Sequence, residues 1–253
     1  MPLSEITYSI PALSEITFSG LPGMLADSLP DKFGNIVIKR YLESQGRDKN
    51  SLSALEKLCY TGKRGMGALE YEPSTDIVDI NEEINIDALT KPASDILSER
   101  ESLHLKYDDN MIAQLMQGSS SVGGARAKTL ITLNPETNEV RSGQINAGEG
   151  FEYWLLKFDD ISNNKDKDQE PDNKEYTRIE YAYYLMAKSA GIKMSECRLY
   201  KENGRAHFMT KRFDRKGASG EKLHMQNLCA IAHMDLIPRE CINMRMLSVL
   251  CAN

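Results

Sequence analysis

The first regular pattern along the chain is a helical one. Apolar residues recur every three or four positions after Asp31, whose side chain is suited to capping a helix N-terminus. A second, shorter helix is predicted to begin after Ser53, another capping residue type, and to stop at Gly62. The apolar side of the first helix comprises Phe33, Ile36, Val37, Tyr41 and Leu42, and the second helix runs through Leu55, Leu58 and Cys59.

Three weaker patterns complete the first half of the chain. A short duplication, residues 4–9 and 14–19, predicts two extended segments. Residues 65–71 predict a glycine turn that leads into a strand. Residues 77–117 are rich in Asp, Glu, Ile and Leu, and they predict helices that link two units with a boundary near residue 75.

Strand patterns dominate the second half. Residues 129–133 alternate and contain β-branched types, and residues 134–138 predict a turn after them. Another strand is predicted at residues 152–158, and two more surround Asn203 and Gly204. The pattern therefore predicts a small sheet of short strands.

Two charged residues stand inside the predicted elements. Residues 177–191 predict an amphipathic helix that Thr177 caps, with Glu180 in its first turn. Lys157 interrupts an otherwise apolar strand, and burying its charge unpaired would cost several kcal/mol. Lys157 must therefore reach the sheet edge or meet an anion, and Glu180 is the predicted partner. The alternative is an edge lysine and a glutamate that the helix dipole favours.

The most distinctive stretch is rich in glycine and serine and precedes the first predicted strand. Gly118, Gly123 and Gly124 let backbone N–H groups approach a phosphate. Arg126 and Lys128 add positive charge. The stretch is not a Walker loop, because that motif places Lys directly after its second glycine. It predicts a phosphate-cradling loop between two strands, and the alternative is a polar hairpin turn.

The order of these parts is loop, strand lysine, helix glutamate and hairpin. The small lobe of a protein kinase has the same order, with a loop over the ATP phosphates and a helix Glu that holds the strand Lys. A triphosphate needs donors over its oxygens and a fixed cation, and an opposing carboxylate fixes a lysine. Lys157 and Glu180 are predicted to be that pair.

Composition narrows the class of protein. The chain has 253 residues, a net charge of −6 and a pI near 5.4, which argues against a nucleic-acid-binding surface of its own. Its five cysteines and four histidines show no metal-ligand spacing, so we expect reduced thiols in a cytoplasmic protein. No apolar run is long enough to span a bilayer, and no signal peptide is present.

With these residues assembled, the chain resembles the HipA family, the serine/threonine kinase toxins of bacterial type II toxin–antitoxin modules. The resemblance rests on Glu180 and on residues 20–34, 62–70, 121–128 and 211–215, in family order. It implies an α+β (mixed α/β) fold in which a HipA-type N-terminal subdomain precedes a protein-kinase-like small lobe. The implied divisions are residues 1–75 for the subdomain, 76–117 for linking helices, 118–216 for the small lobe and 217–253 for the start of the large lobe.

The resemblance also implies site residues. Lys157, held by Glu180, would contact the ATP phosphates. Ser121 would be autophosphorylated, with Ser119 and Ser120 as alternatives. A phosphate there would add about −1.5 to −2 charges and repel the nucleotide. The backbone of Gly123, Gly124, Ala125, Arg126, Ala127 and Lys128 would cover the phosphates, and Lys211, Arg212 and Phe213 would form the adenine hinge.

The family implies ATP and Mg²⁺ as ligands. Its inhibitory partner is a small DNA-binding antitoxin of the HipB type, so contact with DNA would be indirect, which agrees with the acidic charge of this chain. Family substrates include aminoacyl-tRNA synthetases.

Two features depart from the family. The Asp and Asn residues that position the substrate hydroxyl and bind Mg²⁺ in a kinase are expected after residues 222–235, and no such segment follows. Residues 236–253 differ from the family continuation, whereas a shifted frame from Cys241 can encode a similar one. We therefore expect a frameshifted, truncated and catalytically incomplete kinase whose start is also missing, and we assign no catalytic or metal-binding residue. The alternatives are a fragment that binds the antitoxin or full-length toxin, and an unrelated phosphate-binding protein.

Overall fold

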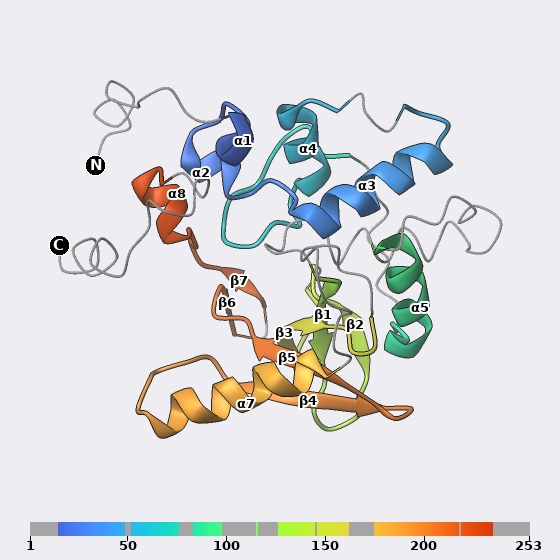
Figure 1. Cartoon of the computed structure of the whole chain (residues 1–253), viewed down its shortest axis with the longest axis vertical. Coiled ribbons are helices and arrows are strands. Elements are labelled where there is room, and N and C mark those ends of the chain that lie inside the picture. Colours follow the sequence, from blue (N-terminus) through green and yellow to red (C-terminus); the bar gives the residue numbers. More distant parts are fainter. Residues whose placement is uncertain are drawn as a thin grey trace, which may run out of the picture.

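The computed structural model describes residues 15–48, 52–75, 83–97, 115, 126–144, 146–161, 175–217 and 219–234. In chain order the elements are α1 (Glu15–Phe18), α2 (Gly23–Ala26), α3 (Lys32–Ser44), α4 (Ala54–Thr61), α5 (Ile86–Leu97), β1 (Lys128–Leu133), β2 (Val140–Ser142), β3 (Glu152–Lys157), α7 (Tyr176–Ser189), β4 (Cys197–Glu202), β5 (Arg205–Lys211), β6 (Arg215–Lys216), β7 (Glu221–Lys222) and α8 (Leu228–Ala232). A helical layer of α1–α4 and α8 lies on one side of the sheet, and α7 packs on β4 and β5 away from that layer (Figure 1). Helices combined with an antiparallel sheet give the α+β fold that the sequence predicted.

Two N-terminal helices begin where the sequence predicted. Asp31 caps α3, because its Oδ1 accepts the N–H of Gly34 at 2.7 Å. Ser53 caps α4 in a capping box with Glu56, and Gly62 ends that helix with a positive φ of 51°. The apolar face of α3 is buried as predicted, with Phe33, Val37 and Leu42 fully enclosed. These predictions are confirmed because capping and periodicity are local properties of the sequence.

Two other local predictions are wrong. Residues 15–18 form α1 rather than an extended segment, and Phe18 packs against the ring of His233 with centroids 5.9 Å apart. Residues 65–71 contain bends and no strand, because Gly67 has a φ of 75° and its N–H donates to Asp214. Both departures involve residues from the far end of the chain, which no local pattern contains. The first copy of the duplication, residues 4–9, lies outside the described residues.

The main sheet has five strands in the order β2-β1-β3-β5-β4, and all neighbours are antiparallel. The predicted turns at residues 134–138 and at Asn203 and Gly204 join β1 to β2 and β4 to β5. Asn203 and Gly204 both have positive φ, as a tight two-residue hairpin requires. All six residues of β1 are buried, in contrast to the alternation expected from the sequence, because β1 is an interior strand whose Ile131 and Leu133 join the core with α3.

α7 is the predicted amphipathic helix, but its start differs from the prediction. Its N-cap is Glu175, which makes no side-chain capping hydrogen bond. Thr177 is buried inside the first turn, and its hydroxyl donates to Asp159 at 2.9 Å. Glu180 therefore lies in the second turn. A tertiary contact of Thr177 has replaced its predicted capping of the helix.

One hydrophobic core joins the helices to the sheet. α3 and α5 pack against each other, and α5 lies inside the stretch where the sequence predicted linking helices. The described part of the chain has no helix long and apolar enough to cross a membrane. The buried cluster includes Phe33, Val37, Ile38, Leu42, Ile86, Leu89, Ile131, Leu133, Trp154, Leu156 and Met209.

Candidate functional site

Lys157 and Glu180 lie together at one end of the sheet. Lys157 is the last residue of β3, and its Nζ lies 2.6 Å from Oε2 of Glu180 on α7. The two side chains are 30% and 29% exposed, so the pair borders solvent rather than the core. The structure brings together the two residues whose pairing the sequence predicted. Their contact with a nucleotide stays a prediction.

Asp159 anchors the helix that carries Glu180. Its Oδ1 accepts the Thr177 hydroxyl at 2.9 Å, and its Oδ2 accepts the N–H of Ala206 at 2.7 Å and a guanidinium N–H of Arg178 at 3.0 Å. Burial alone would raise the pKa of Asp159, but these donors lower it below its ordinary value. α7 is therefore tied to β3 and β5. Sequence reasoning missed Asp159, and the one local signal was a carboxylate two residues after the strand lysine.

Lys128 lies opposite Lys157 but meets a different carboxylate. The two lysines are cross-strand partners in β1 and β3. Lys128 Nζ lies 2.5 Å from Oδ2 of Asp31, and the Lys128 side chain is 2% exposed. Burial lowers the pKa of Lys128 and raises that of Asp31, against the attraction within the pair. The positive charge of Lys128, which was predicted to face a phosphate, is therefore compensated by Asp31 inside the fold.

The structure describes the end of the predicted glycine-rich loop. The guanidinium of Arg126 stacks on Tyr176, 3.5 Å from the ring centroid, at the start of α7. Ala127 is buried, and its carbonyl accepts the N–H of Phe158 at 3.2 Å. The remaining predicted loop residues lie outside the described residues: Ser119, Ser120, Ser121, Gly123, Gly124 and Ala125.

The predicted hinge lies at the end of β5. The N–H groups of Lys211 and Arg212 donate to carbonyl oxygens of neighbouring segments, so the fold uses both. The Arg212 guanidinium binds both carboxylate oxygens of Asp214, at 2.9 and 2.7 Å, and both side chains are buried. Phe213 is 62% exposed between them, and its N–H donates to no group in the described part of the chain. Lys211 itself pairs with Glu152 at 2.5 Å.

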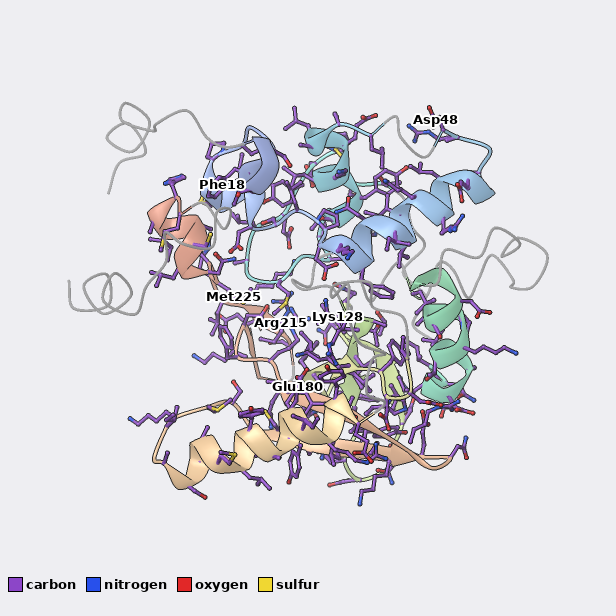
Figure 2. The ribbon with its side chains drawn as sticks, viewed as in Figure 1. Phe18, Asp48, Lys128, Glu180, Arg215 and Met225 are labelled. Carbon is purple, nitrogen blue, oxygen red and sulfur yellow. The ribbon has the colours of Figure 1, made fainter. Side chains whose placement is uncertain are left out.

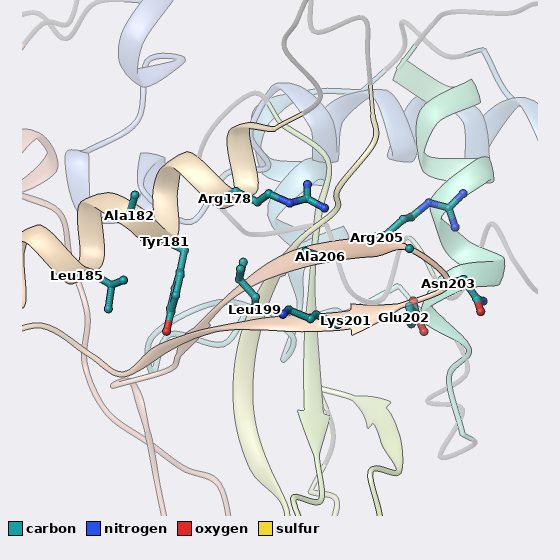
Figure 3. A pocket seen from close by; sticks show the side chains of 11 residues that line it. Arg178, Tyr181, Ala182, Leu185, Leu199, Lys201, Glu202, Asn203, Arg205 and Ala206 are labelled. Carbon is teal, nitrogen blue, oxygen red and sulfur yellow. The ribbon is translucent and has the colours of Figure 1, made fainter.

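Two of the hollows that border α7 differ strongly in size. The first lies at Lys157 and Glu180 and has a volume of about 20 Å³, which is room for about one water molecule. The second, of about 670 Å³, opens between α7 and the β4–β5 hairpin, and Tyr181 and Leu185 point into it (Figure 3). Because the wider hollow is not lined by Lys157, it is separate from the predicted nucleotide site.

A kinase also needs a divalent metal ion. Among the residues that the structure describes, no group of three His, Cys, Asp or Glu side chains is placed to hold one. Asp159 lies close to Lys157 in the chain, but its oxygens accept three hydrogen bonds from the fold. These residues do not fit a magnesium site, so we assign no step to a metal.

The geometry defines an α+β protein with an antiparallel sheet, in which a helix glutamate holds a strand lysine. Two family models match the chain: the HipA-like C-terminal domain over residues 120–247 and the HipA N-terminal domain over residues 1–72. The first match alone spans more than half of the chain, and the protein belongs to the HipA family. A comparison with curated proteins found no match. Membership places the chain in a family of toxin-type kinases and makes kinase activity the activity to test.

Proposed function

We propose that this protein provides the nucleotide-binding part of an ATP-dependent serine/threonine kinase of the HipA type, with Lys157 at the nucleotide phosphates. The observation that carries the proposal is the 2.6 Å contact between Lys157 and Glu180. In protein kinases a strand lysine must be held by a helix glutamate before it can contact the phosphates. The partial exposure of Lys157 leaves its ammonium accessible to such a ligand.

The hinge supports the same function. The N–H groups of Lys211 and Arg212 have acceptors within the fold, whereas the N–H of Phe213 has none among the described residues. We therefore assign the Phe213 N–H as the donor to the adenine edge. The buried pair of Arg212 and Asp214 holds the backbone on both sides of this donor.

The glycine-rich loop supplies the remaining part of the proposal. Its backbone N–H groups would bind the phosphate oxygens, and Ser121 would accept the γ-phosphoryl group, with Ser119 and Ser120 as alternatives. In that step the serine oxygen bonds to the γ-phosphorus, the bond to the ADP oxygen breaks, and the hydroxyl proton passes to a base. The base and the Mg²⁺ ligands are not among the described residues. A phosphorylated loop would repel the nucleotide and inhibit the kinase.

The family also supplies the proposed setting. A HipB-type DNA-binding antitoxin would inhibit the kinase, and an aminoacyl-tRNA synthetase represents the proposed substrate class. The three described cysteines, Cys59, Cys197 and Cys229, are free thiols, which suits the proposed location in the cytoplasm.

Calorimetry with MgATP tests the nucleotide site. Wild-type protein should bind MgATP, and Lys157→Ala should weaken binding at least about tenfold, because the fixed cation is lost. Lys201→Ala is the matched control, since Lys201 is an exposed lysine on β4. Radiolabelled ATP then tests transfer to the loop serines. Equal affinities of wild type and Lys157→Ala would refute the proposal.

A second function is favoured by one surface. α7 exposes several large apolar side chains, which is typical of a protein contact. The chain could thus bind the antitoxin or full-length toxin without catalysing transfer. A pull-down with each partner discriminates the two functions, because binding without phosphate transfer supports the second one. The exposed side chains are Ile179, Tyr183, Leu185 and Met186.

A further inference from the structure

Asp31 belongs to the N-terminal helices, yet it contacts the strand that follows the glycine-rich loop. Its Oδ1 caps α3 by accepting the Gly34 N–H at 2.7 Å, and its Oδ2 lies 2.5 Å from Lys128 Nζ. The Asp31 and Lys128 side chains are 8% and 2% exposed. One buried carboxylate therefore joins the start of a helix to the first residue of β1.

Lys128 and Lys157 place two like charges on neighbouring strands. They are directly opposite in the register of β1 and β3, so their side chains leave the same face of the sheet. Each lysine meets its own carboxylate: Asp31 approaches Lys128 from the helical layer, and Glu180 approaches Lys157 from α7. Burial is the largest cause of the lowered pKa of Lys128, and Lys157 lowers it further while Asp31 and Glu180 oppose both.

Loss of the Asp31 charge would affect both Lys128 and Lys157. If Asp31 were neutral, the Lys128 ammonium would stay buried, with Glu180 as the nearby carboxylate that both lysines attract. A shared Glu180 holds Lys157 less firmly, and a Lys128 that has lost the charge of Asp31 repels Lys157 more strongly. The position of the Lys157 ammonium therefore depends on Asp31.

The same part of the chain also reaches the segment that follows the predicted hinge. The Gly67 N–H donates to Asp214 at 2.8 Å, and Arg215 donates to the carbonyl oxygens of Gly65 and Gly67 at 2.9 and 3.1 Å. Lys128 and Arg215 both lie at the junction between the helical layer and the sheet (Figure 2). The N-terminal unit, defined as α1–α4 with the turn at residues 65–67, therefore contacts both Lys128 and the segment that follows the predicted hinge.

We infer that Asp31 is a positioning residue for the phosphate-binding Lys157, so that the N-terminal unit forms part of the nucleotide site. The inference rests on the proposed function, because it takes Lys157 as the residue that binds the phosphates. Linkage makes the effect reciprocal: nucleotide bound at Lys157 stabilises the Asp31 contact by the same factor by which that contact favours the nucleotide. A ligand on the N-terminal unit could then change nucleotide affinity without entering the site.

Calorimetry with MgATP on four forms of the protein tests the inference: wild type, Asp31→Asn, Lys128→Met and the double variant. Asn keeps the helix cap and removes the charge. Asp31→Asn should weaken MgATP binding about tenfold, and adding Lys128→Met should restore it to within about threefold, because the positive charge that repels Lys157 is gone. An unchanged affinity in Asp31→Asn overturns the inference. So does a loss that Lys128→Met fails to restore.

Hydrogen exchange on the wild-type protein gives a second test that does not depend on how Asp31→Asn folds. MgATP should slow exchange of the Gly34 amide, whose acceptor is Asp31, and unchanged exchange overturns the inference. Lys157→Ala separates the two proposals. If wild type does not bind MgATP, the proposed function fails and the inference fails with it. If binding depends on Lys157 but not on Asp31, the inference alone fails.

Discussion

Lys157 and Lys128 carry the same charge on neighbouring strands, but their environments give them different roles. Lys157 is partly exposed beside Glu180, whereas Lys128 is enclosed with Asp31. An exposed pair contributes little to stability, and a buried pair is costly to break from one side. The sequence predicted that both lysines face a phosphate, because no local pattern indicates that the distant Asp31 contacts Lys128. Burial therefore decides which lysine is available to a ligand.

Glu180→Gln should weaken nucleotide binding while leaving the stability of the fold nearly unchanged. The substitution removes the charge that holds Lys157, so MgATP affinity should fall by about three- to tenfold. The free energy of unfolding should change by less than about 1 kcal/mol, because the pair is partly exposed. Calorimetry and urea unfolding measure the two effects, with Glu136→Gln in an exposed turn as control. A large loss of stability with unchanged affinity would contradict this expectation.

His207 should make stability depend on pH. Its Nδ1 accepts the N–H of Asp159 at 2.9 Å, and burial lowers the pKa of His207 from 6.5 to about 4. Between these two values the unfolded chain binds a proton that the folded chain does not bind. The free energy of unfolding should therefore decrease by up to about 3 kcal/mol as the pH falls through this window.

Urea unfolding at pH 7 and pH 4.5 measures the His207 effect. His207→Asn keeps a side-chain acceptor near the Asp159 N–H but does not titrate in this range. Its loss of stability between the two pH values should be smaller than that of wild type by about 2–3 kcal/mol. The same pH dependence in both proteins would exclude His207 as the cause.

At the scale of elements, local signals predicted some boundaries well and others poorly. The start of α3 and the hairpin at Asn203 and Gly204 follow from capping and turn chemistry, which act within a few residues. The predicted start of α7 was wrong because the Thr177 hydroxyl donates to Asp159 instead of capping the helix. No sequence pattern around Asp159 or around Thr177 predicts that contact.

Asp159 should contribute strongly to the docking of α7. Asp159→Ala removes the acceptor for Thr177 and Arg178 and leaves the buried Ala206 N–H without its partner. The free energy of unfolding should fall by about 2–4 kcal/mol. Thr177→Val removes one of these hydrogen bonds and should cost only about 1 kcal/mol. Urea unfolding of both variants tests the ranking, and a costlier Thr177→Val would reverse it.

At the scale of the whole molecule, the N-terminal unit lies against the backbone of Met225 at Gly67. Gly67 has a φ of 75°, and an added Cβ would lie 3.2 Å from the backbone N of Met225 and 3.3 Å from its O. Gly46 has a similar φ of 70° with nothing within 4 Å of such a Cβ. Both glycines therefore have the left-handed backbone conformation, but only Gly67 lies close to another segment of backbone.

Gly67→Ala should destabilise the protein more than Gly46→Ala. Both variants bear the cost of an L-residue in the left-handed region, about 1–2 kcal/mol. Gly67→Ala should lose about 1–3 kcal/mol more, because the Met225 backbone must move. Urea midpoints of both variants measure the difference. Equal losses of stability in the two variants would show that the Met225 backbone can move aside without an energetic cost.

The overall class of the fold and the pairing of Lys157 with Glu180 could be predicted from the sequence, because periodicity and the order of parts carry them. The contacts that hold the site could not be predicted. Asp31 with Lys128, and Gly67 with Asp214, join residues far apart in the chain. Such pairings depend on how elements pack, which a single sequence without coordinates does not encode in any local pattern.

α8 packs on α2, although the two helices lie near opposite ends of the described chain. The Gly23 N–H donates to His233 at 3.1 Å, and the Asn227 N–H donates to Asp27 at 2.9 Å. During translation α2 therefore emerges from the ribosome long before its packing partner is made. Domains commonly fold from the N-terminus as they are synthesised, and unpaired apolar surface invites aggregation meanwhile. The demand for chaperones in the cell should therefore depend on how long α2 remains without α8.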